Sequence, residues 1–561
     1  MTTTRVPGLD ADALAALRTR AERWLADDPD PAAAAELRRV LDGLPATAAD
    51  LADRFSGPLR FGTAGLRGPL RAGPNGMNLA VVRGAAAGLA RWLDAQGATG
   101  PVVIGYDARY GSVEFATETA RVCTGTGRRA LLLPGPLPTP VLAHAVRALD
   151  AAAGVMVTAS HNPPADNGYK VYLGAGLGGP AGDGAQLVPP ADAAIEESIR
   201  RVGPLATVPL GQPGEVLGPE IVASYVDGAA AVVDAMQPKE LAVAYTPLHG
   251  VARATFTAAL VAAGFDAPLV VAEQAEPDPE FPTVAFPNPE EPGAMDRVVA
   301  LAARSGADLA IASDPDGDRC AVAIPVAGRG GSAARWRVLR GDEVGVLLAD
   351  HLMRRGVRGR YATTIVSSSL LRALCAKRGR PYGETLTGFK WIVRAGEDLV
   401  YGYEEALGYC VAPEHVRDKD GVTAALLICE LAAGLHAEFR TLADRLDELA
   451  HEFGVYATDQ LSVRVDDLSE IDSTMRWLRS HPPTALLDEP VLAVENLAPD
   501  VMMLHSSSAR VVVRPSGTEP KLKAYLEVVE PVVGGDVAGA RERAAAGLAA
   551  LRTETATALG L

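Results

Sequence analysis

The feature that most constrains the fold is one plan that the chain repeats three times. In each repeat, apolar runs rich in β-formers end abruptly in a polar loop bearing Gly or Pro, and Ala/Leu-rich helical segments separate the runs. The paired runs lie at residues 102–104 and 154–157, 241–244 and 309–312, and 361–366 and 398–401. Strands that alternate with helices are typical of α/β domains. The sequence therefore predicts three similar α/β domains with mixed sheets.

The pattern changes after the third repeat. Residues 461–465 and 510–513 alternate apolar and polar side chains, a further strand is predicted over 521–529, and an Ala/Arg-rich helix begins at Val537. These elements predict a smaller α+β domain, reached through a hinge at residues 453–455. At roughly 150 residues per domain, a chain of 561 residues also suggests about four domains. Their predicted bounds are residues 1–212, 213–328, 329–454 and 455–561.

Composition excludes several classes of protein. A net charge of −16 repels nucleic acid and anionic membranes, so neither is expected as a partner. The N-terminal 30 residues lack the apolar core of a signal peptide, and no apolar run reaches membrane-spanning length. Five cysteines at scattered spacings fit reduced thiols and neither a disulfide framework nor a zinc site. We therefore expect a compact cytoplasmic protein, as a monomer or a homodimer.

A serine turn follows the second apolar run of the first repeat. Residues 158–163 read Thr-Ala-Ser-His-Asn-Pro and place the Ser160 hydroxyl beside the His161 imidazole. A free hydroxyl is barely ionised near neutral pH, so Ser160 needs a base, an oxyanion environment or a metal to become a nucleophile. Adjacent side chains usually point apart, so we expect His161 to orient a phosphate rather than to act as the direct base. An ordinary turn is the alternative, because Ser, Asn and Pro are common turn residues.

Three aspartates alternate along the loop after the second run of the second repeat: Asp314, Asp316 and Asp318. A loop sharpened by Pro and Gly lets all three carboxylates converge on one hard cation. An EF-hand loop begins with the same alternation, but it requires a glycine where Arg319 stands and a glutamate where Pro325 stands. A solvated turn is the other alternative, although three converging carboxylates without a cation would repel one another. At least one coordination position stays free for a seryl phosphate oxygen, and Arg319 could hold the same phosphate.

The serine and the aspartates complement each other chemically. A hydroxyl can carry a phosphoryl group, and a hard cation can neutralise the charge of that group. Together they indicate metal-assisted phosphoryl transfer.

A loop near the C-terminus combines a guanidinium with hydroxyls and a glycine: Arg514, Ser516, Gly517 and Thr518. A bidentate guanidinium, two hydroxyls and a backbone that can approach closely suit a phosphate dianion. A tight turn between strands is the alternative. Beside a phosphoryl-transfer site elsewhere in the chain, the loop is predicted to be a second phosphate pocket.

Two more loops are candidates for substrate binding. Glu404 and Glu405 lie in a Gly-flanked loop, where they could accept hydrogen bonds from sugar hydroxyls; unpaired surface glutamates are the alternative. The charged turn at residues 415–421 contains Arg417 and Lys419, whose side chains could support a distal phosphate.

Together these motifs resemble the α-D-phosphohexomutases, the phosphoglucomutase/phosphomannomutase superfamily, over nearly the full length of the chain. The serine turn resembles the family's phosphoserine loop, the aspartate loop its magnesium loop, the Glu404 region its sugar-recognition loop and the Arg514 region its phosphate-binding loop. Further matching segments lie at residues 61–68, 167–170 and 387–390. Four loops in the right order are specific jointly, although none of them would be alone.

The resemblance implies four domains around a central cleft, the first three alike and the fourth mobile. It implies that phosphorylated Ser160 gives its phosphoryl group to a sugar monophosphate, that the bisphosphorylated sugar turns end over end, and that its other phosphate returns to Ser160. The implied cofactors are Mg²⁺ and a sugar bisphosphate, which serves as activator and intermediate. The implied partners are small-molecule sugar phosphates.

The resemblance also implies roles for single residues. Asp314, Asp316 and Asp318 would hold Mg²⁺ with the seryl phosphate as a further ligand; Arg67 and Arg319 would stabilise the transferring group; Lys170 and Lys390 would be candidates for proton transfer; Glu404 would grip the sugar. A neutral amine is the base required toward a sugar hydroxyl, so burial beside cations would have to lower the pKa of one lysine.

One residue departs from the family pattern. Ala406 stands where many members carry a serine whose hydroxyl contacts the sugar. Glucose, mannose and pentose phosphates therefore all stay open as substrates, with phosphoglucomutase activity favoured. The loop at 403–408 and the turn at 417–421 look most like the long-chain branch that includes phosphopentomutase-like enzymes. A metal-dependent sugar phosphatase would not need the second phosphate pocket, and an idle sugar-phosphate binder would not need the serine.

Overall fold

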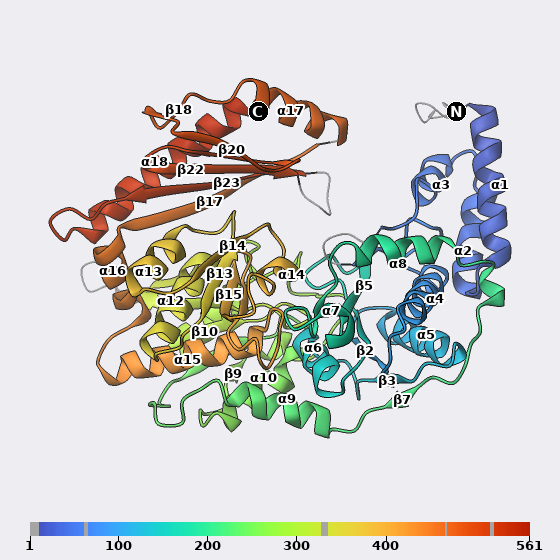
Figure 1. The fold of residues 1–561 in the computed structure, drawn as a ribbon, viewed down its shortest axis with the longest axis horizontal. Helices are drawn as coiled ribbons and strands as arrows, with labels where there is room; N and C mark the ends of the chain where they lie inside the picture. The colour runs from blue at the N-terminus through green and yellow to red at the C-terminus, as the bar shows by residue number, and fades with distance from the viewer. Residues whose placement is uncertain (1–9, 61–64, 327–334, 466–467, 516–520, 561) are drawn as a thin grey trace. The chain divides into compact units, whose positions relative to one another are not determined.

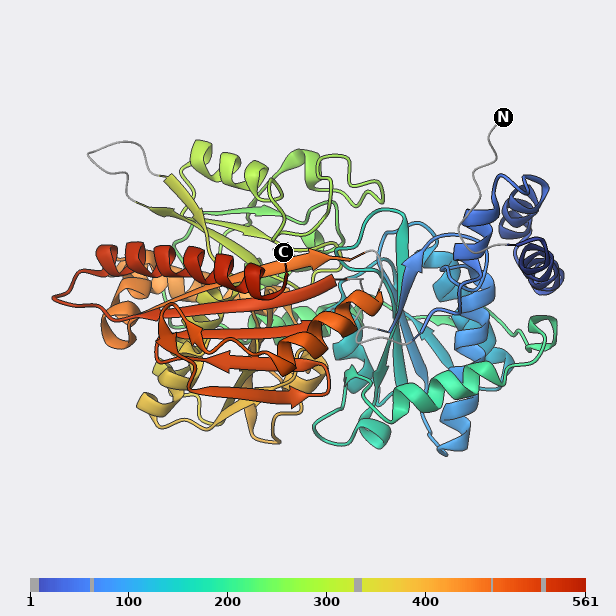
Figure 2. The ribbon, with the colours of Figure 1, turned by 90° about the horizontal axis from the view of Figure 1, so that it is seen from above.

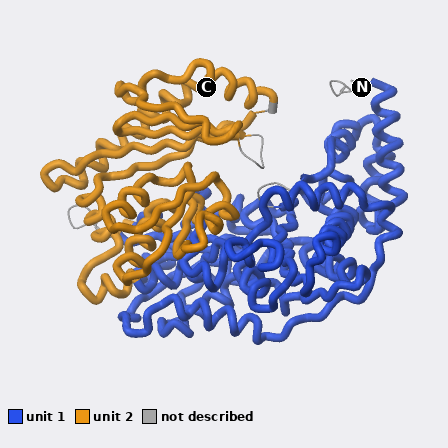
Figure 3. The backbone as a smooth tube through the Cα atoms, in the orientation of Figure 1, with its two compact units in different colours: residues 1–325, 336–338, 408–430 blue, residues 326–335, 339–407, 431–561 orange. Residues whose placement is uncertain are grey.

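The chain forms two compact units, which Figure 3 shows in different colours. The computed structural model describes residues 10–60, 65–326, 335–465, 468–515 and 521–560. Unit 1 comprises residues 1–325, 336–338 and 408–430, and unit 2 comprises residues 326–335, 339–407 and 431–561. The predicted site residues are accordingly divided between the two units.

Unit 1 begins with three helices that pack around a small apolar core of their own. Asp10 and Asp30 precede the first two helices, and their carboxylates accept hydrogen bonds from the amides of Ala13 and Ala32, which caps both helix starts. The helices are α1 (Ala11–Asp27), α2 (Pro31–Asp42) and α3 (Ala48–Arg54), drawn in dark blue in Figure 1.

The first sheet of unit 1 has seven strands and is mixed. Its order is β1-β5-β4-β2-β3-β7, with β6 paired to β5. The central strand β2 runs parallel to β3 and β4, whereas β5 is antiparallel to β4. The strands are β1 (Leu66–Pro69), β2 (Val102–Tyr106), β3 (Ala130–Leu132), β4 (Ala153–Val157), β5 (Asp166–Leu173), β6 (Ala185–Gln186) and β7 (Glu215–Val216). The helices are α4 (Leu79–Ala95), α5 (Ser112–Gly125), α6 (Thr139–Ala148), α7 (Ala175–Gly178), α8 (Ala191–Arg200) and α9 (Glu220–Ala230), with a 3-10 turn at Leu205–Thr207.

The second sheet of unit 1 has five strands in the order β12-β11-β10-β8-β9. The two central strands, β8 and β10, are parallel and entirely buried, as expected for continuous apolar runs. The strands are β8 (Val243–Thr246), β9 (Leu269–Val270), β10 (Leu309–Ala312), β11 (Ala321–Val326) and β12 (Arg335–Val338). The other elements are α10 (Ala252–Ala262), α11 (Asp296–Ser305), the 3-10 turn at Ala272–Gln274 and the short strand β16 (Gly408–Cys410).

Unit 2 contains the third α/β sheet. Its strand β13 runs parallel to both of its neighbours, β14 and β15. The strands are β13 (Arg360–Thr364), β14 (Tyr382–Thr385) and β15 (Leu399–Glu404). The helices are α12 (Gly341–Arg354), α13 (Leu370–Arg378), α14 (Phe389–Ile392) and α16 (Leu442–Phe453); α15 (Gly421–Ala437) begins among the residues of unit 1.

The C-terminal part of unit 2 is an antiparallel sheet in the order β17-β23-β22-β21-β20. Helix α18 packs along β17 and β23, as Figure 2 shows. The strands are β17 (Val455–Arg464), β18 (Ala485–Leu486), β19 (Glu489–Pro490), β20 (Ala493–Ala498), β21 (Val501–His505), β22 (Ala509–Pro515) and β23 (Lys521–Glu530). The helices are α17 (Leu468–Ser480) and α18 (Val537–Ala558).

The predicted strands and their order are confirmed. Each of the six apolar runs contains or overlaps a strand, and the three parallel-centred sheets are followed by one antiparallel sheet. Gly454 links α16 to β17 with a φ of +93°, at the position predicted for a hinge. The predicted domain bounds and the mobility of the last domain stay predictions.

The described residues also bear on the membrane and the thiols. No single described helix is long and apolar enough to cross a membrane, whereas α15 and α16 pass the length and composition test as a bent pair. All five cysteines are buried and free.

Candidate active site

Ser160 follows β4 in a left-handed backbone conformation that is unusual for a residue other than glycine. Its φ is +52°, and its amide donates to Thr158 Oγ1 at 2.9 Å. The residue is buried, and its Oγ donates to Asp314 Oδ2 at 2.7 Å. The serine and the first aspartate, 154 positions apart in the sequence, are therefore in direct contact.

The same turn brings the neighbouring imidazole to the hydroxyl. Ser160 Oγ lies 3.1 Å from His161 Nδ1. The expectation that these two side chains point apart is wrong, because it holds for extended backbone and not for a left-handed residue. Burial lowers the pKa of His161 well below its ordinary value, and the nearby cations Arg319 and Arg67 lower it further. Because the single Ser160 hydroxyl proton is donated to Asp314, a neutral imidazole protonated at Nδ1 can donate a hydrogen bond to Ser160 Oγ.

The three aspartates follow β10 and converge. Asp314, Asp316 and Asp318 are all buried, and one carboxylate oxygen from each lies within 4.8 Å of the others. Gly317 supplies the left-handed turn between them with a φ of +66°. Burial raises the pKa of Asp314 well above its ordinary value, and the two neighbouring carboxylates raise it further. Asp314 is therefore harder to ionise than an ordinary carboxyl group.

Asp316 differs from Asp314 because a lysine compensates it. Burial alone would raise the pKa of Asp316, but the Lys170 ammonium and the hydrogen bonds that this carboxylate accepts outweigh burial and lower it. Lys170 Nζ lies 2.8 Å from Asp316 Oδ2 and 3.4 Å from Asp318 Oδ2. The buried Lys170 thus contacts two carboxylates and not the cations expected beside one of the two candidate lysines, Lys170 and Lys390.

A second lysine reaches the cluster from the charged turn. Lys419 Nζ lies 3.2 Å from Asp318 Oδ2. The turn packs closely on the aspartate loop: a Cβ on Gly421 would lie 2.3 Å from the carbonyl oxygen of Arg319. Lys419 was predicted to support a distal phosphate, and its observed contact is with the aspartate loop. Arg417 in the same turn is buried, which lowers the pKa of its guanidinium.

Two guanidinium groups lie near the serine and the aspartates. Arg67, on β1, donates from Nη1 to Asn162 Oδ1 at 2.9 Å, and burial lowers its pKa. Arg319 Nε lies 4.0 Å from Asp314 Oδ2 and 3.9 Å from Asp318 Oδ1. The structure therefore brings together the predicted nucleophile, the three aspartates, His161, Lys170 and both predicted arginines within unit 1.

The residues of unit 2 are described by their own contacts. Glu404 is the buried last residue of β15, and Glu405 Oε2 accepts a hydrogen bond from Ser367 Oγ at 3.0 Å. Lys390 is buried in α14, with Nζ 5.7 Å from the centre of the Trp391 ring. Arg514 is the last residue but one of β22, and its guanidinium carbon lies 5.8 Å from the centre of the Tyr525 ring. Ser516, Gly517 and Thr518 lie outside the described residues.

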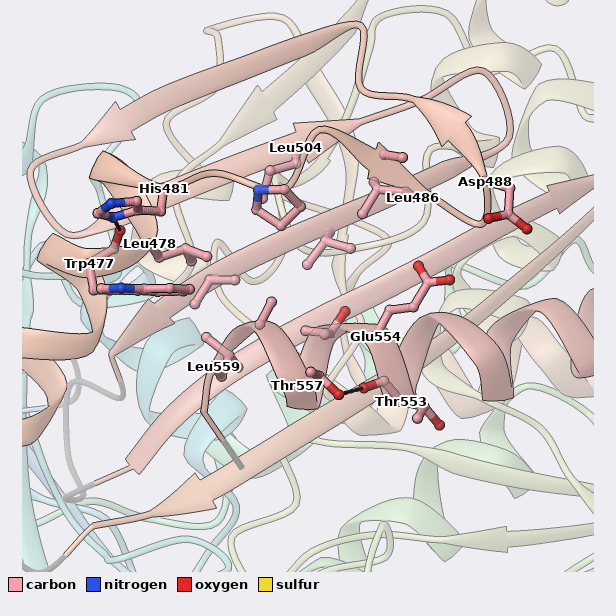
Figure 4. A pocket seen from close by; sticks show the side chains of 16 residues that line it. Trp477, Leu478, His481, Leu486, Asp488, Leu504, Thr553, Glu554, Thr557 and Leu559 are labelled. Atoms are coloured by element: carbon pink, nitrogen blue, oxygen red, sulfur yellow. Dashed lines mark hydrogen bonds between the residues drawn. The ribbon is translucent and has the colours of Figure 1, made fainter.

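The C-terminal part of unit 2 contains a cavity of about 500 Å³ (Figure 4). None of the side chains described above lines it. Its walls are mainly apolar, with Leu478, Leu486 and Leu504 among them, and Trp477 and His481 stack at one end. Its acidic members, Asp488 and Glu554, would repel a phosphate. It contains none of the predicted site residues and does not suit a sugar phosphate.

Family models match four stretches of the chain in order. Their descriptions are phosphoglucomutase/phosphomannomutase α/β/α domains I, II and III and the C-terminal domain, matched to residues 58–204, 223–328, 340–453 and 490–541. The chain belongs to the phosphoglucomutase/phosphomannomutase family. The predicted family, the four-domain architecture and the class of phosphosugar mutase are thereby confirmed.

Relatives in the phosphoglucomutase/phosphomannomutase family are named for three different sugar substrates. A protein named "Probable phosphomannomutase" from Haemophilus influenzae is 43% identical, over 81% of this chain and 93% of its own. A phosphoglucomutase from Staphylococcus aureus strain MRSA252 is 32% identical over 85% of this chain and 91% of its own. A phosphopentomutase from Mus musculus is 31% identical over 94% and 92%. Likeness to relatives therefore does not decide the sugar.

The aspartate cluster of this family member fits the Mg²⁺ on which the family generally depends. Asp316 Oδ1 and Asp318 Oδ1 are buried and have no hydrogen-bond partner among the described residues. Mg²⁺ prefers carboxylate and other oxygen ligands. A cation there would satisfy both oxygens and relieve the repulsion among the three carboxylates.

Sequence reasoning missed two contributors to this phosphohexomutase site. Thr139 Oγ1, at the start of α6, donates to Asp316 Oδ2 at 2.8 Å. Arg109, in the loop after β2, donates to the backbone of the serine turn. The apolar run at residues 102–104 ends abruptly, and this signal could have pointed to the loop that carries Arg109. No local pattern in the sequence pointed to Thr139.

Proposed function

We propose that the chain interconverts a sugar 1-phosphate with the corresponding 6-phosphate of a hexose or 5-phosphate of a pentose, through a phosphorylated Ser160 and a bisphosphorylated sugar. The observation that carries the proposal is the contact of Ser160 Oγ with Asp314 in a buried cluster of three carboxylates. A hydroxyl poised against a cation site is what transfer of a phosphoryl group requires.

The transfer balances as two displacements. In the first, the bond between phosphorus and Ser160 Oγ breaks as a sugar hydroxyl oxygen bonds to phosphorus, the sugar hydroxyl proton passes to a base, and the leaving Ser160 Oγ takes up a proton. Lys170 and Lys390 are the proposed proton carriers, and His161 orients the phosphate at Ser160. In the second displacement, Ser160 Oγ bonds to the phosphorus of the other phosphate of the turned sugar bisphosphate, the bond between that phosphorus and the sugar oxygen breaks, and the leaving sugar oxygen takes up a proton from the base. When bound by Asp314, Asp316 and Asp318, Mg²⁺ neutralises charge on the phosphoryl oxygens.

The remaining predicted residues bind substrate in this proposal. Arg67 and Arg319 stabilise the transferring phosphoryl group, because guanidinium groups bind its equatorial oxygens. Arg514, with Ser516, Gly517 and Thr518, holds the phosphate that is not being transferred. Glu404 and Glu405 accept hydrogen bonds from sugar hydroxyls, and Arg417 and Lys419 support the distal phosphate.

Glucose phosphate is the proposed preferred substrate, with mannose and pentose phosphates as the competitors. Relative kcat/KM for the 1-phosphates of glucose, mannose and ribose, each with its bisphosphate primer, decides among them. The cytoplasmic location and the monomeric or homodimeric state stay predictions from the sequence.

Ser160→Ala tests the chemistry directly. The variant should lose mutase turnover, while glucose 1-phosphate still binds in calorimetry, because only the nucleophilic oxygen is removed. Ser305→Ala, on the exposed end of α11, is the matched control and should keep wild-type activity. Undiminished turnover in Ser160→Ala would refute the assignment. Release of inorganic phosphate without isomerisation by the wild type would instead support a phosphatase.

A further inference from the structure

Arg109 is connected to the serine turn by an unusual number of hydrogen bonds. Its Nη2 donates to the carbonyl oxygens of Ser160 and Asn162, both at 2.6 Å. Its Nη1 donates to those of Pro163 at 2.7 Å and Asp166 at 3.1 Å. Four carbonyls within seven residues of one loop thus point at a single guanidinium, which is only 5% exposed.

These bonds occupy the whole terminal part of the guanidinium. Each of the two terminal nitrogens carries two N–H groups, and the four carbonyls account for all four. The remaining Nε lies 3.5 Å from Asp107 Oδ2. Arg109 therefore has no terminal donor left for a substrate phosphate, which separates it from Arg67 and Arg319.

Arg109 is itself held in place from two sides. Asp107 Oδ1 accepts from the amide of Arg109 at 3.0 Å, and Asp107 Oδ2 accepts from Thr158 Oγ1 at 2.6 Å. The ring of Phe281 covers the guanidinium, with its centre 5.0 Å from the guanidinium carbon. Arg109 and Asp107, which we call the clamp, thus connect the loop after β2 to both ends of the serine turn.

We propose that Arg109 is a positioning residue for the phosphoryl-carrying serine: its guanidinium holds residues 160–166 in the conformation that places Ser160 Oγ against Asp314. The left-handed backbone of Ser160 is unfavourable for an L-residue and needs support from outside the turn. The planar fork of arginine can bind four carbonyls at once, whereas the ammonium of lysine has three donors and no plane. The proposal rests on the proposed function of Ser160.

The test compares Arg109→Lys with Arg128→Lys. Arg128 is a matched control because it also donates to two backbone carbonyls, those of Ala98 and Gly100, in the same sheet domain but away from the serine turn. Two readouts are measured: amide hydrogen exchange of residues 158–168, and kcat and KM with glucose 1-phosphate, its bisphosphate and Mg²⁺. The amides of Ser160, Asn162 and Asp166 donate within the turn and report its opening.

In Arg109→Lys, exchange in the turn should rise at least about 10-fold while the rest of the sheet keeps its protection. The value of kcat should fall about 100-fold, as for a misplaced reacting group, with KM changed less than about threefold. Arg128→Lys should change neither readout. Unchanged exchange and kcat in Arg109→Lys, or a rise in KM alone, would overturn the proposal.

Thr158→Val is the second variant, for use if Arg109→Lys does not fold. It removes only the hydroxyl that donates to Asp107 and accepts from the Ser160 amide. Thr158→Val should also raise amide exchange in the serine turn and lower kcat, but by smaller factors than Arg109→Lys. Amide exchange in the turn at the wild-type rate would contradict the proposed clamp. Hydrogen exchange does not depend on turnover, so it tests Arg109 even if the wild type proves inactive as a mutase.

Discussion

Lys170 Nζ and Asp316 Oδ2 form a buried ion pair at 2.8 Å, with both side chains almost fully shielded from solvent. The pair joins β5 of the first sheet to the aspartate loop of the second. It therefore connects the domain that carries the proposed nucleophile with the domain that carries the candidate cation site.

Lys170→Met should destabilise the metal-free protein. The variant leaves buried carboxylates without their ammonium, which typically costs about 3 to 5 kcal/mol in the free energy of unfolding. Mg²⁺ should recover part of the loss, because a bound cation compensates the same carboxylates. Thermal unfolding with EDTA and with Mg²⁺ measures both effects. Lys377→Met removes a half-exposed lysine and serves as control; equal melting of both variants in EDTA would contradict the prediction.

Gly250→Ala should weaken Mg²⁺ binding without touching a ligand. A Cβ on Gly250 would lie 2.4 Å from the Cα and 2.5 Å from the carbonyl oxygen of Pro315, so the aspartate loop would have to shift. A displaced support for metal ligands typically costs about 10- to 100-fold in affinity. Calorimetric titration with Mg²⁺ measures the change. Gly135→Ala, where a Cβ meets no atom within 4 Å, should bind Mg²⁺ as the wild type does.

Arg514→Ala should raise KM for the sugar phosphate about 10-fold or more and change kcat much less. An interaction made equally in the ground state and the transition state contributes to binding and not to the chemical step. Steady-state kinetics with saturating bisphosphate primer separate the two constants. Arg476→Ala, on the exposed face of α17, is the control. A fall in kcat alone would indicate that Arg514 acts in the chemical step, and it would contradict the proposed role in phosphate binding.

The parts of the site that sequence could predict are local. Residues 158–163 and the three aspartates each carry their chemistry in a few consecutive positions, at the end of a strand that hydrophobic pattern already marks. Those loops lie where open α/β sheets bind ligands, so their meeting was predictable from topology. The contact of Ser160 with Asp314 follows from that logic.

The parts that sequence missed depend on pairs that no local pattern specifies. Thr139 and Asp316 are 177 positions apart, and Lys419 meets Asp318 from a turn that sequence assigned to substrate. The contact between Ser160 and His161 was missed for another reason. A left-handed serine breaks a general rule of backbone preference, and in our proposal the hydrogen bonds from Arg109 hold the turn in that conformation.

Asp342 provides a prediction about pH that is independent of the active site. Its buried carboxylate accepts hydrogen bonds from the Ser368 amide at 2.7 Å, Tyr403 Oη at 3.2 Å and Thr458 Oγ1 at 3.0 Å. Burial, and to a lesser degree the charge of Glu527, raises the pKa of Asp342 to about 6, although the hydrogen bonds from Ser368 and Thr458 and the charge of Arg510 act to lower it. Unfolding returns the pKa to about 3.9. The folded state therefore binds the proton more tightly, and this group makes the protein less stable as pH rises from about 4 to about 6.

Asp342→Asn should remove that part of the pH dependence. The amide can keep the bonds from Ser368 and Tyr403 at its oxygen and donate to the Thr458 hydroxyl from its nitrogen. A shift of about two pKa units corresponds to about 3 kcal/mol, so the variant should gain up to that amount relative to the wild type between pH 4 and pH 7. Urea unfolding at several pH values measures the difference. Asp342→Ala leaves three donors unsatisfied and should be less stable at every pH; a wild-type slope in the asparagine variant would show that Asp342 does not titrate in this range.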